Sequence, residues 1–196
     1  MKIVAIVGSY RRGGVVESAV DELLAAAEER GAAVEKVHLL DRRVDFCSNC
    51  RACTLEPGPD RGACPMADDM PAILDALEAC DGIVLASPVN FGTVTALMKR
   101  FVERTVCHAY WPWGDSPRPR QSPRRRAVVV VATAAPAWLA RWGSDAARLL
   151  RKTARLLGAE PTETLRIGLA RQNPDAVLAD TARARARAIG RRLAAA

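Results

Sequence analysis

Short apolar runs alternate with longer segments of helical periodicity along the chain. The runs that predict strands are 3–7, 33–40, 82–86, 127–133 and 162–168. The segments whose spacing predicts helices are 15–30, 68–80, 92–107, 137–157 and 175–193. Parallel strands need crossover connections, which helices provide, so this order predicts a three-layer α/β sandwich around a five-stranded parallel sheet of order 2-1-3-4-5. We expect one domain over residues 1–196.

The composition narrows the class of partner. Apolar residues make up 49 % and charged residues 26 %, which excludes a disordered or fibrous chain. The longest apolar run, 127–140, is too short to span a bilayer, and no cleavage signal follows the N-terminal apolar stretch, so we expect a cytoplasmic protein without a membrane partner. The net charge of +7 would attract acidic molecules, but aromatic residues make up only 5 %, which leaves little for base stacking and argues against nucleic acid.

The loop after the first strand reads GSYRRGGVVE and has the character of an anion site. Ser9, Gly13 and Gly14 let the backbone turn so that its N–H groups face an anion at the start of the next helix. Arg11 adds a guanidinium that can bind a phosphate. The sequence matches neither the P-loop nor the G-x-G-x-x-G pattern. The alternative is a tight strand-to-helix turn that carries exposed arginines.

A second loop follows the third strand and reads SPVNFG. Pro88 and Gly92 shape a turn, while Val89, Asn90 and Phe91 offer two apolar groups and an amide, which would suit a planar heterocycle. Ligands of such sheets bind beyond the carboxyl ends of the strands, where the strand order reverses, and Thr133 and Ala134 end a strand on this edge. The alternative is that Phe91 only packs on the neighbouring helix.

Four cysteines crowd into the loop over residues 41–65. In a cytosolic chain this indicates metal or redox chemistry rather than disulfides. The spacing C-x2-C-x2-C can supply three ligands of a 4Fe–4S cluster, with a fourth after a further ten residues. Zinc bound by four cysteines and free thiols are the other two readings. The candidate metal ligands are Cys47, Cys50, Cys53 and Cys64.

Two arginine-rich segments lie in the second half of the chain. The Pro/Arg-rich loop over 108–126 is long enough to be functional or mobile, and we expect its arginines to be solvated. Arg183, Arg187 and Arg191 share one face of the last helix, which we also expect to face solvent. The two histidines and the carboxylates form no arrangement typical of acid–base or nucleophilic catalysis, so we expect no catalytic side chain.

Taken together, these motifs resemble the NAD(P)H-dependent FMN reductases of flavodoxin-like fold, a family that includes the iron–sulfur flavoproteins. The shared motifs, in the family's order, are Gly8-Ser9-Tyr10-Arg11, the cysteine loop, Asp68-Asp69-Met70, and Ser87 to Gly92 followed by Lys99 and Arg104. The chain has Val15 and Val16 where the family has Asn-Thr, and Asn90 where an aromatic residue is usual.

The resemblance implies an enzyme that transfers hydride from NAD(P)H to bound FMN and then electrons to a second acceptor. That acceptor would be a quinone, a flavin or a protein, reached through a 4Fe–4S cluster if one is present, and the enzyme would be a homodimer or homotetramer. Two rival functions are an electron-transfer protein without its own turnover and a flavin-free, zinc-binding regulator that binds nucleic acid. The residues implied to bind FMN are Ser9, Arg11, Gly13, Gly14, Val15, Val16, Pro88, Val89, Asn90, Phe91, Gly92, Thr133 and Ala134.

Overall fold

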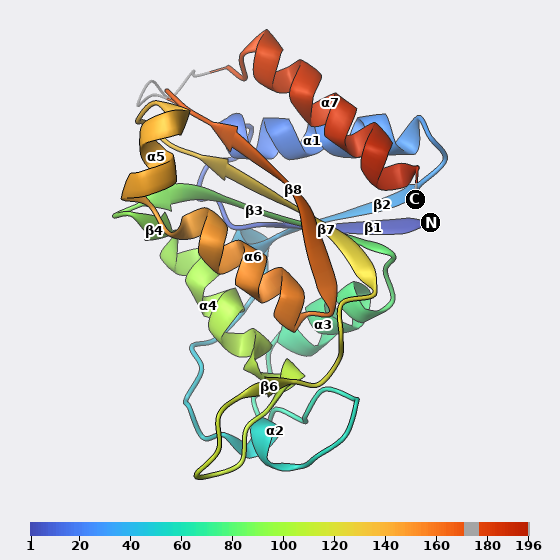
Figure 1. The fold of residues 1–196 in the computed structure, drawn as a ribbon, viewed down its shortest axis with the longest axis vertical. Helices are drawn as coiled ribbons and strands as arrows, with labels where there is room; N and C mark the ends of the chain where they lie inside the picture. Colours follow the sequence, from blue (N-terminus) through green and yellow to red (C-terminus); the bar gives the residue numbers. More distant parts are fainter. Residues whose placement is uncertain (171–176, 196) are drawn as a thin grey trace.

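The computed structural model of the chain describes residues 1–170 and 177–195. Its centre is a twisted sheet of order β2-β1-β3-β7-β8, in which every pair of neighbours is parallel (Figure 1). The predicted order 2-1-3-4-5 is confirmed, with β7 and β8 as its fourth and fifth strands. A sixth, short strand, β4 (Thr93–Val94), pairs antiparallel with β3. The five long strands are β1 (Lys2–Val7), β2 (Ala33–His38), β3 (Gly82–Asn90), β7 (Arg125–Ala132) and β8 (Ala159–Ile167).

Helices cover both faces of the sheet and complete the predicted three layers. One face carries α1 (Val15–Glu28) and α7 (Asp180–Ala194), and the other carries α3 (Met70–Glu78), α4 (Ala96–Arg104) and α6 (Ala146–Leu156) (Figure 1). Strand β7 shows why the sequence requires this arrangement. Val128 and Val130 point into the core under α1 and α7, while Val129 and Val131 point into the opposite core. A strand that is apolar on both faces needs cover on both.

Several element boundaries differ from the sequence-based expectation. The helix predicted over 92–107 begins only at Ala96, because Phe91 and Gly92 both take positive φ and turn the chain back as a β-hairpin. The helix predicted over 137–157 is two helices, α5 (Ala137–Gly143) and α6, which Ser144 and Asp145 separate. The last helix begins at Asp180 rather than 175, and positions 175 and 176 lie outside the described residues.

The loops over 41–65 and 108–126 come together below the sandwich as one unit, which we call the cysteine lobe (Figure 1). It contains the short helix α2 (Ala52–Leu55) and the two-stranded pairing of β5 (Ala109–Tyr110) with β6 (Arg118–Pro119). Arg120 joins its two halves, because its guanidinium donates to the carbonyl oxygens of Cys107, Gly58 and Cys53 at 3.0, 3.1 and 3.2 Å. The expectation of a solvated arginine loop is therefore wrong for Arg120.

Helix α7 packs closely on α1. A Cβ added to Gly190 would lie 2.0 Å from the carbonyl oxygen of Leu23, so the two backbones are almost in contact. Arg183 and Arg187 form ion pairs with Glu22 of α1, and these pairs replace the solvated face that the sequence suggested. None of the helices within residues 1–170 and 177–195 has both the length and the apolar character needed to cross a bilayer.

Candidate functional site

The β1–α1 loop leaves the N-terminus of a helix without a side-chain cap. Gly14 is the N-cap residue of α1 and has no side chain to accept the first N–H groups, which begin at Val15 and Val16. Gly13 takes φ +63°, and nothing lies within 4 Å of where its Cβ would be. The side chain of Ser9 is buried and accepts the N–H of Arg11 at 3.1 Å, which fixes the turn. An anion could supply the missing cap.

Glu17, which the sequence reasoning missed, lies beneath this loop. Its side chain is buried, and its carboxylate accepts the N–H of Gly13 at 2.7 Å and the ammonium of Lys36 at 2.9 Å. Burial alone would raise the pKa of Glu17, but the hydrogen bonds from Lys36 and Gly13 hold it below its ordinary value. One amide that we expected to face a phosphate is therefore already used. The signal was present, since a glutamate in the first turn of a helix often reaches back to the cap.

The end of β3 is joined to the first loop through Thr95. This buried hydroxyl donates to the carbonyl oxygen of Gly8 at 2.7 Å and accepts the N–H of Met98 at 3.0 Å as the cap of α4. The backbone N–H of Thr95 donates to Ser87 at 3.2 Å. The two loops predicted to bind FMN are thus held side by side at the carboxyl edge of the sheet. Tyr10 adds a further link, since its hydroxyl accepts the N–H of Leu97.

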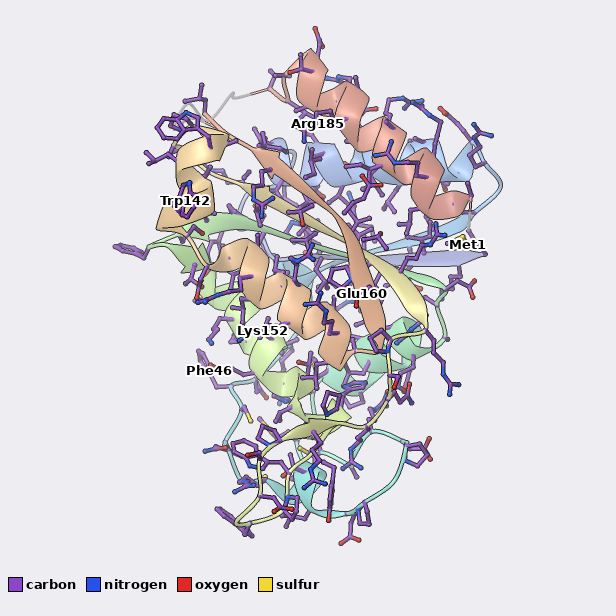
Figure 2. All side chains as sticks on the ribbon, viewed as in Figure 1. Met1, Phe46, Trp142, Lys152, Glu160 and Arg185 are labelled. Carbon is purple, nitrogen blue, oxygen red and sulfur yellow. The ribbon has the colours of Figure 1, made fainter. Side chains whose placement is uncertain are left out.

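Phe91 occupies the tip of the β3–β4 hairpin. Its side chain is fully exposed, so the alternative reading, in which it packs on the neighbouring helix, is wrong. The hairpin abuts the junction between α5 and α6, because the N–H of Asp145, the N-cap residue of α6, donates to the carbonyl oxygen of Gly92 at 2.8 Å. Helix α5 also exposes large apolar side chains, and Trp142 projects from its surface (Figure 2). The exposed apolar residues of the hairpin, α5 and the segment after β8 are Phe91, Trp138, Leu139, Trp142 and Leu169, which we call the carboxyl-edge patch.

Thr133 and Ala134 follow β7 on the same edge. Thr133 shares a cavity of about 80 Å³ with Val89, while Ala134 is exposed. Pro88 pairs in register with Ala132, so the third predicted loop lies beside the second. The structure therefore brings the three predicted segments to one edge, as the sheet topology requires.

The four candidate metal ligands lie together in the cysteine lobe. Cys47, Cys50, Cys53 and Cys64 all line one small cavity, together with Arg51 and Trp111. Two residues of this turn, Asn49 and Arg51, take positive φ, and such strained positions concentrate at ligand sites. Over the described part of the chain, no three His, Cys, Asp or Glu side chains converge closely enough to hold one metal ion.

Two arginines place positive charge at this cavity. The Nη2 of Arg104 donates to the sulfur of Cys64 at 3.6 Å. The guanidinium of Arg51 lies over the rings of both Trp111 and Trp113, 4.2 and 3.9 Å from their centroids. Its Nε is buried and has no hydrogen-bond acceptor among the described residues. Four thiols, two guanidiniums and an unsatisfied donor together fit an anionic, thiolate-bound group.

The thiol environments within this set differ. Burial, followed by the neighbouring thiols of Cys64, Cys47 and Cys50, raises the pKa of Cys53. Hydrogen bonds from the Ala52 N–H and from Ser48 lower the pKa of the exposed Cys50 thiol. Cys80 and Cys107 are buried outside the set, and burial raises the pKa of Cys107 to about 12, so it is an inert apolar residue.

A second, larger cavity of about 890 Å³ is lined by residues of both the cysteine lobe and α3. Sequence reasoning did not identify it, because its wall combines residues from five separate segments. Charges of both signs line it. Its charged lining residues are Asp60, Arg61, Glu78, Asp81, Arg104, Arg124 and Arg125.

Known proteins share both the sequence pattern and the fold. The family model of NADPH-dependent FMN reductases matches residues 1–159. An iron–sulfur flavoprotein of Archaeoglobus fulgidus is 36 % identical over 112 residues, which cover 57 % of this chain and 49 % of the relative. One of Methanocaldococcus jannaschii is 38 % identical over 105 residues, covering 54 % and 52 %. The chain thus spans about half the length of these relatives.

The solved structures confirm the fold. An FMN-dependent NADH-azoreductase of Bacillus anthracis, described in complex with FMN, superposes with a TM-score of 0.71 at 16 % identity, covering 99 % of this chain and 100 % of that one. A flavodoxin from the domain Archaea superposes with a TM-score of 0.58 at 12 % identity, covering 100 % and 97 %. The match over residues 1–159 includes the β1–α1 loop, the cysteines and the β3–β4 hairpin. The chain therefore belongs to the NADPH-dependent FMN reductase family, a family of oxidoreductases with a flavodoxin-like fold.

Proposed function

We propose that the chain binds FMN at the carboxyl edge of its sheet and oxidises NAD(P)H. The observation that carries this proposal is the uncapped N-terminus of α1, held beside the end of β3 through Thr95. A helix start that faces open space favours a phosphate. Ser9, Arg11, Gly13, Gly14, Val15 and Val16 would surround that phosphate.

The isoalloxazine ring would lie against the second and third segments. Pro88, Val89, Asn90, Phe91 and Gly92 offer an apolar wall and backbone amides, and Thr133 and Ala134 lie alongside. Bound flavin supplies hydride-transfer chemistry, so the residues of the chain need only bind it, orient it and exclude water. The exposed Phe91 would be covered by the flavin, by the nicotinamide or by a second subunit.

We further propose that Cys47, Cys50, Cys53 and Cys64 hold a 4Fe–4S cluster. Three observations support it: the four thiols share one cavity, two arginines lie against it, and the relatives are named iron–sulfur flavoproteins. Zinc bound by the same four cysteines is the alternative. A cluster would supply one-electron transfer to an acceptor such as a quinone, a flavin or a protein.

The wider setting is also a proposal. We infer that residues 1–196 act as one FMN-binding domain and that it forms a homodimer or homotetramer. The exposed carboxyl-edge patch supports such an assembly, since exposed apolar patches mark interfaces. All six cysteines are free, which supports a reducing, cytoplasmic location.

Anaerobic purification followed by spectroscopy and turnover tests the function. We expect FMN in the purified protein and steady consumption of NADPH or NADH with a quinone or free flavin as acceptor. Flavin without steady turnover would favour an electron carrier instead. A colourless protein that contains zinc would contradict the proposal and favour the nucleic-acid-binding regulator.

A further inference from the structure

One side chain of α4 reaches both ends of the cysteine loop. Arg104 is buried, and its Nη1 donates to the carbonyl oxygen of Asp45 at 3.1 Å, two residues before Cys47. Its Nη2 donates to the Asp68 carboxylate at 3.1 Å and to the Cys64 sulfur at 3.6 Å. A single guanidinium thus touches the start of the loop, its end and one thiol.

The carboxylate of Asp68 closes the same junction from the other side. It accepts the N–H of Asp45 at 2.8 Å and the N–H of Met70 at 3.1 Å. The side chains of Arg104 and Asp68 are 1 % and 0 % exposed, so their ion pair is screened from water. Next to it, the backbones of Arg43 and Asp69 are also paired, at 2.9 Å. Residues 43–45 and 68–70 form the base of the loop, and these contacts hold them together without involving a cysteine.

This junction explains how a distant cysteine joins the other three. Ten residues, Thr54 to Ala63, separate Cys53 from Cys64, and a flexible gap of that length would not hold a thiol in place. The gap is packed where it returns, since a Cβ on Gly62 would lie 1.8 Å from the carbonyl oxygen of Cys53. Arg104 then holds Cys64 itself.

We propose that Arg104 is a positioning residue that holds Cys64 as the fourth cysteine ligand and donates a hydrogen bond to its sulfur. The inference rests on the proposed cluster. A donor to a ligating sulfur stabilises the more negative, reduced state of a cluster, so Arg104 raises its reduction potential. Removal of such an outer partner lowers metal affinity by roughly 10- to 100-fold.

The matched pair Arg104→Lys and Arg120→Lys tests this proposal. Arg120 lies in the same lobe and donates to three carbonyl oxygens, none of its hydrogen bonds being to a thiol. We expect Arg104→Lys to lose iron to a chelator with an affinity reduced by roughly 10- to 100-fold, and to shift the midpoint potential to more negative values. Arg120→Lys should keep the wild-type potential. Equal potentials in Arg104→Lys and wild type would overturn the proposal, and so would equal shifts in both variants.

Two further measurements distinguish a folding defect, or a missing cluster, from a failure of the role proposed for Arg104. If Arg104→Lys does not fold, the variant Arg104→Gln with Asp68→Asn removes both buried charges together, and we expect the same loss of iron and the same direction of shift. In metal-free protein, hydrogen exchange over residues 46–64 should be faster in Arg104→Lys than in wild type. Unchanged exchange overturns the holding role, whereas wild-type protein that never retains iron and sulfide overturns the cluster itself.

Discussion

Arg11 stands exposed beside the uncapped start of α1, and within the described residues it has no carboxylate at ion-pairing distance. We expect Arg11→Ala to weaken FMN binding by about 1.5–3 kcal/mol, the range for a hydrogen bond to a charged group. Fluorescence titration of the apoprotein with FMN measures it. Arg30→Ala, at the opposite end of α1, is the matched control and should leave affinity unchanged. Unaltered affinity in Arg11→Ala would mean that the phosphate is held elsewhere.

Val16 occupies a position where the family has a threonine. Its side chain is 4 % exposed at the first turn of α1. Val16→Thr restores a hydroxyl next to the proposed phosphate, and one added hydrogen bond should tighten FMN binding by about 0.5–1.5 kcal/mol. The same titration measures this, with thermal unfolding as the check that the buried hydroxyl does not disturb the core. Weaker binding would mean that the loop is aligned wrongly with the family pattern.

Asp68 ties acid stability to the base of the cysteine loop. Burial would raise its pKa, but hydrogen bonds from Arg104 and from the N–H groups of Asp45 and Met70 hold the pKa below its ordinary value. The folded state thus binds fewer protons than the unfolded state. The stabilisation is therefore present above the unfolded pKa of about 3.9 and is lost as pH falls through the folded pKa.

The test is denaturant unfolding of Asp68→Asn across that range. At neutral pH we expect a loss of about 3–5 kcal/mol, since Arg104 is left buried without its partner. The dependence of stability on acid pH should also become shallower. Asp75→Asn breaks an exposed ion pair with Arg61 and should cost only about 0–1 kcal/mol. Equal losses of unfolding free energy in the two variants would mean that the buried pair contributes no more to stability than the exposed pair.

Among the helices, the contact between α7 and α1 makes the sharpest prediction. Gly190→Ala would place a methyl group 2.0 Å from the carbonyl oxygen of Leu23, so the helices must separate. We expect a loss of about 1–3 kcal/mol in the free energy of unfolding, as for overpacked cores. Gly143→Ala is the control, because nothing lies within 4 Å of its Cβ position, and it should be neutral or stabilising. Equal stabilities would contradict the close packing.

The elements also show what the sequence could reveal. The buried valine run of β7 and the order of strands and helices were readable, because burial on both faces leaves a periodic signal. The β3–β4 hairpin was not, since Phe91 at positive φ lacks the usual glycine or asparagine signal. The break between α5 and α6 was missed although the sequence signals it, since Gly143 is typical of a helix end and Ser144 and Asp145 are typical of a helix start.

The candidate site likewise combines features that the sequence reveals with features that it does not. The topology of a parallel sheet predicted that the three segments proposed to bind FMN lie at one edge, and the structure confirms that placement. By contrast, Glu17, Arg51 and Arg104 act through partners far away in the sequence, such as Lys36, Trp111 and Asp68. No local pattern encodes such contacts. The spacing of the cysteines likewise does not specify how the loop holds them. That arrangement decides whether they can bind a cluster.

For the whole molecule, the position of the cysteine lobe at one end of the sandwich predicts that metal removal affects the lobe more than the sheet. We expect iron chelation to speed hydrogen exchange over 41–65 and 108–126 while the strands of the sheet remain protected, because Val44 and Cys53 are the contributions of 41–65 to the buried core. FMN that stays bound after chelation would show that the carboxyl edge of the sheet is intact. Loss of FMN together with iron would show that the two regions depend on each other.

The close packing of α7 on α1 has a consequence for biosynthesis. Helix α1 is synthesised long before α7, yet part of its apolar surface packs against Ala186, Ile189 and Leu193 of α7. A Cβ on Gly82 would lie within 3.5 Å of both Met1 and Leu193, so these two distant residues meet at the start of β3. Until residue 193 has emerged from the ribosome, the nascent chain leaves that part of the α1 surface uncovered, so we expect α1 to complete its packing only after α7 has been synthesised.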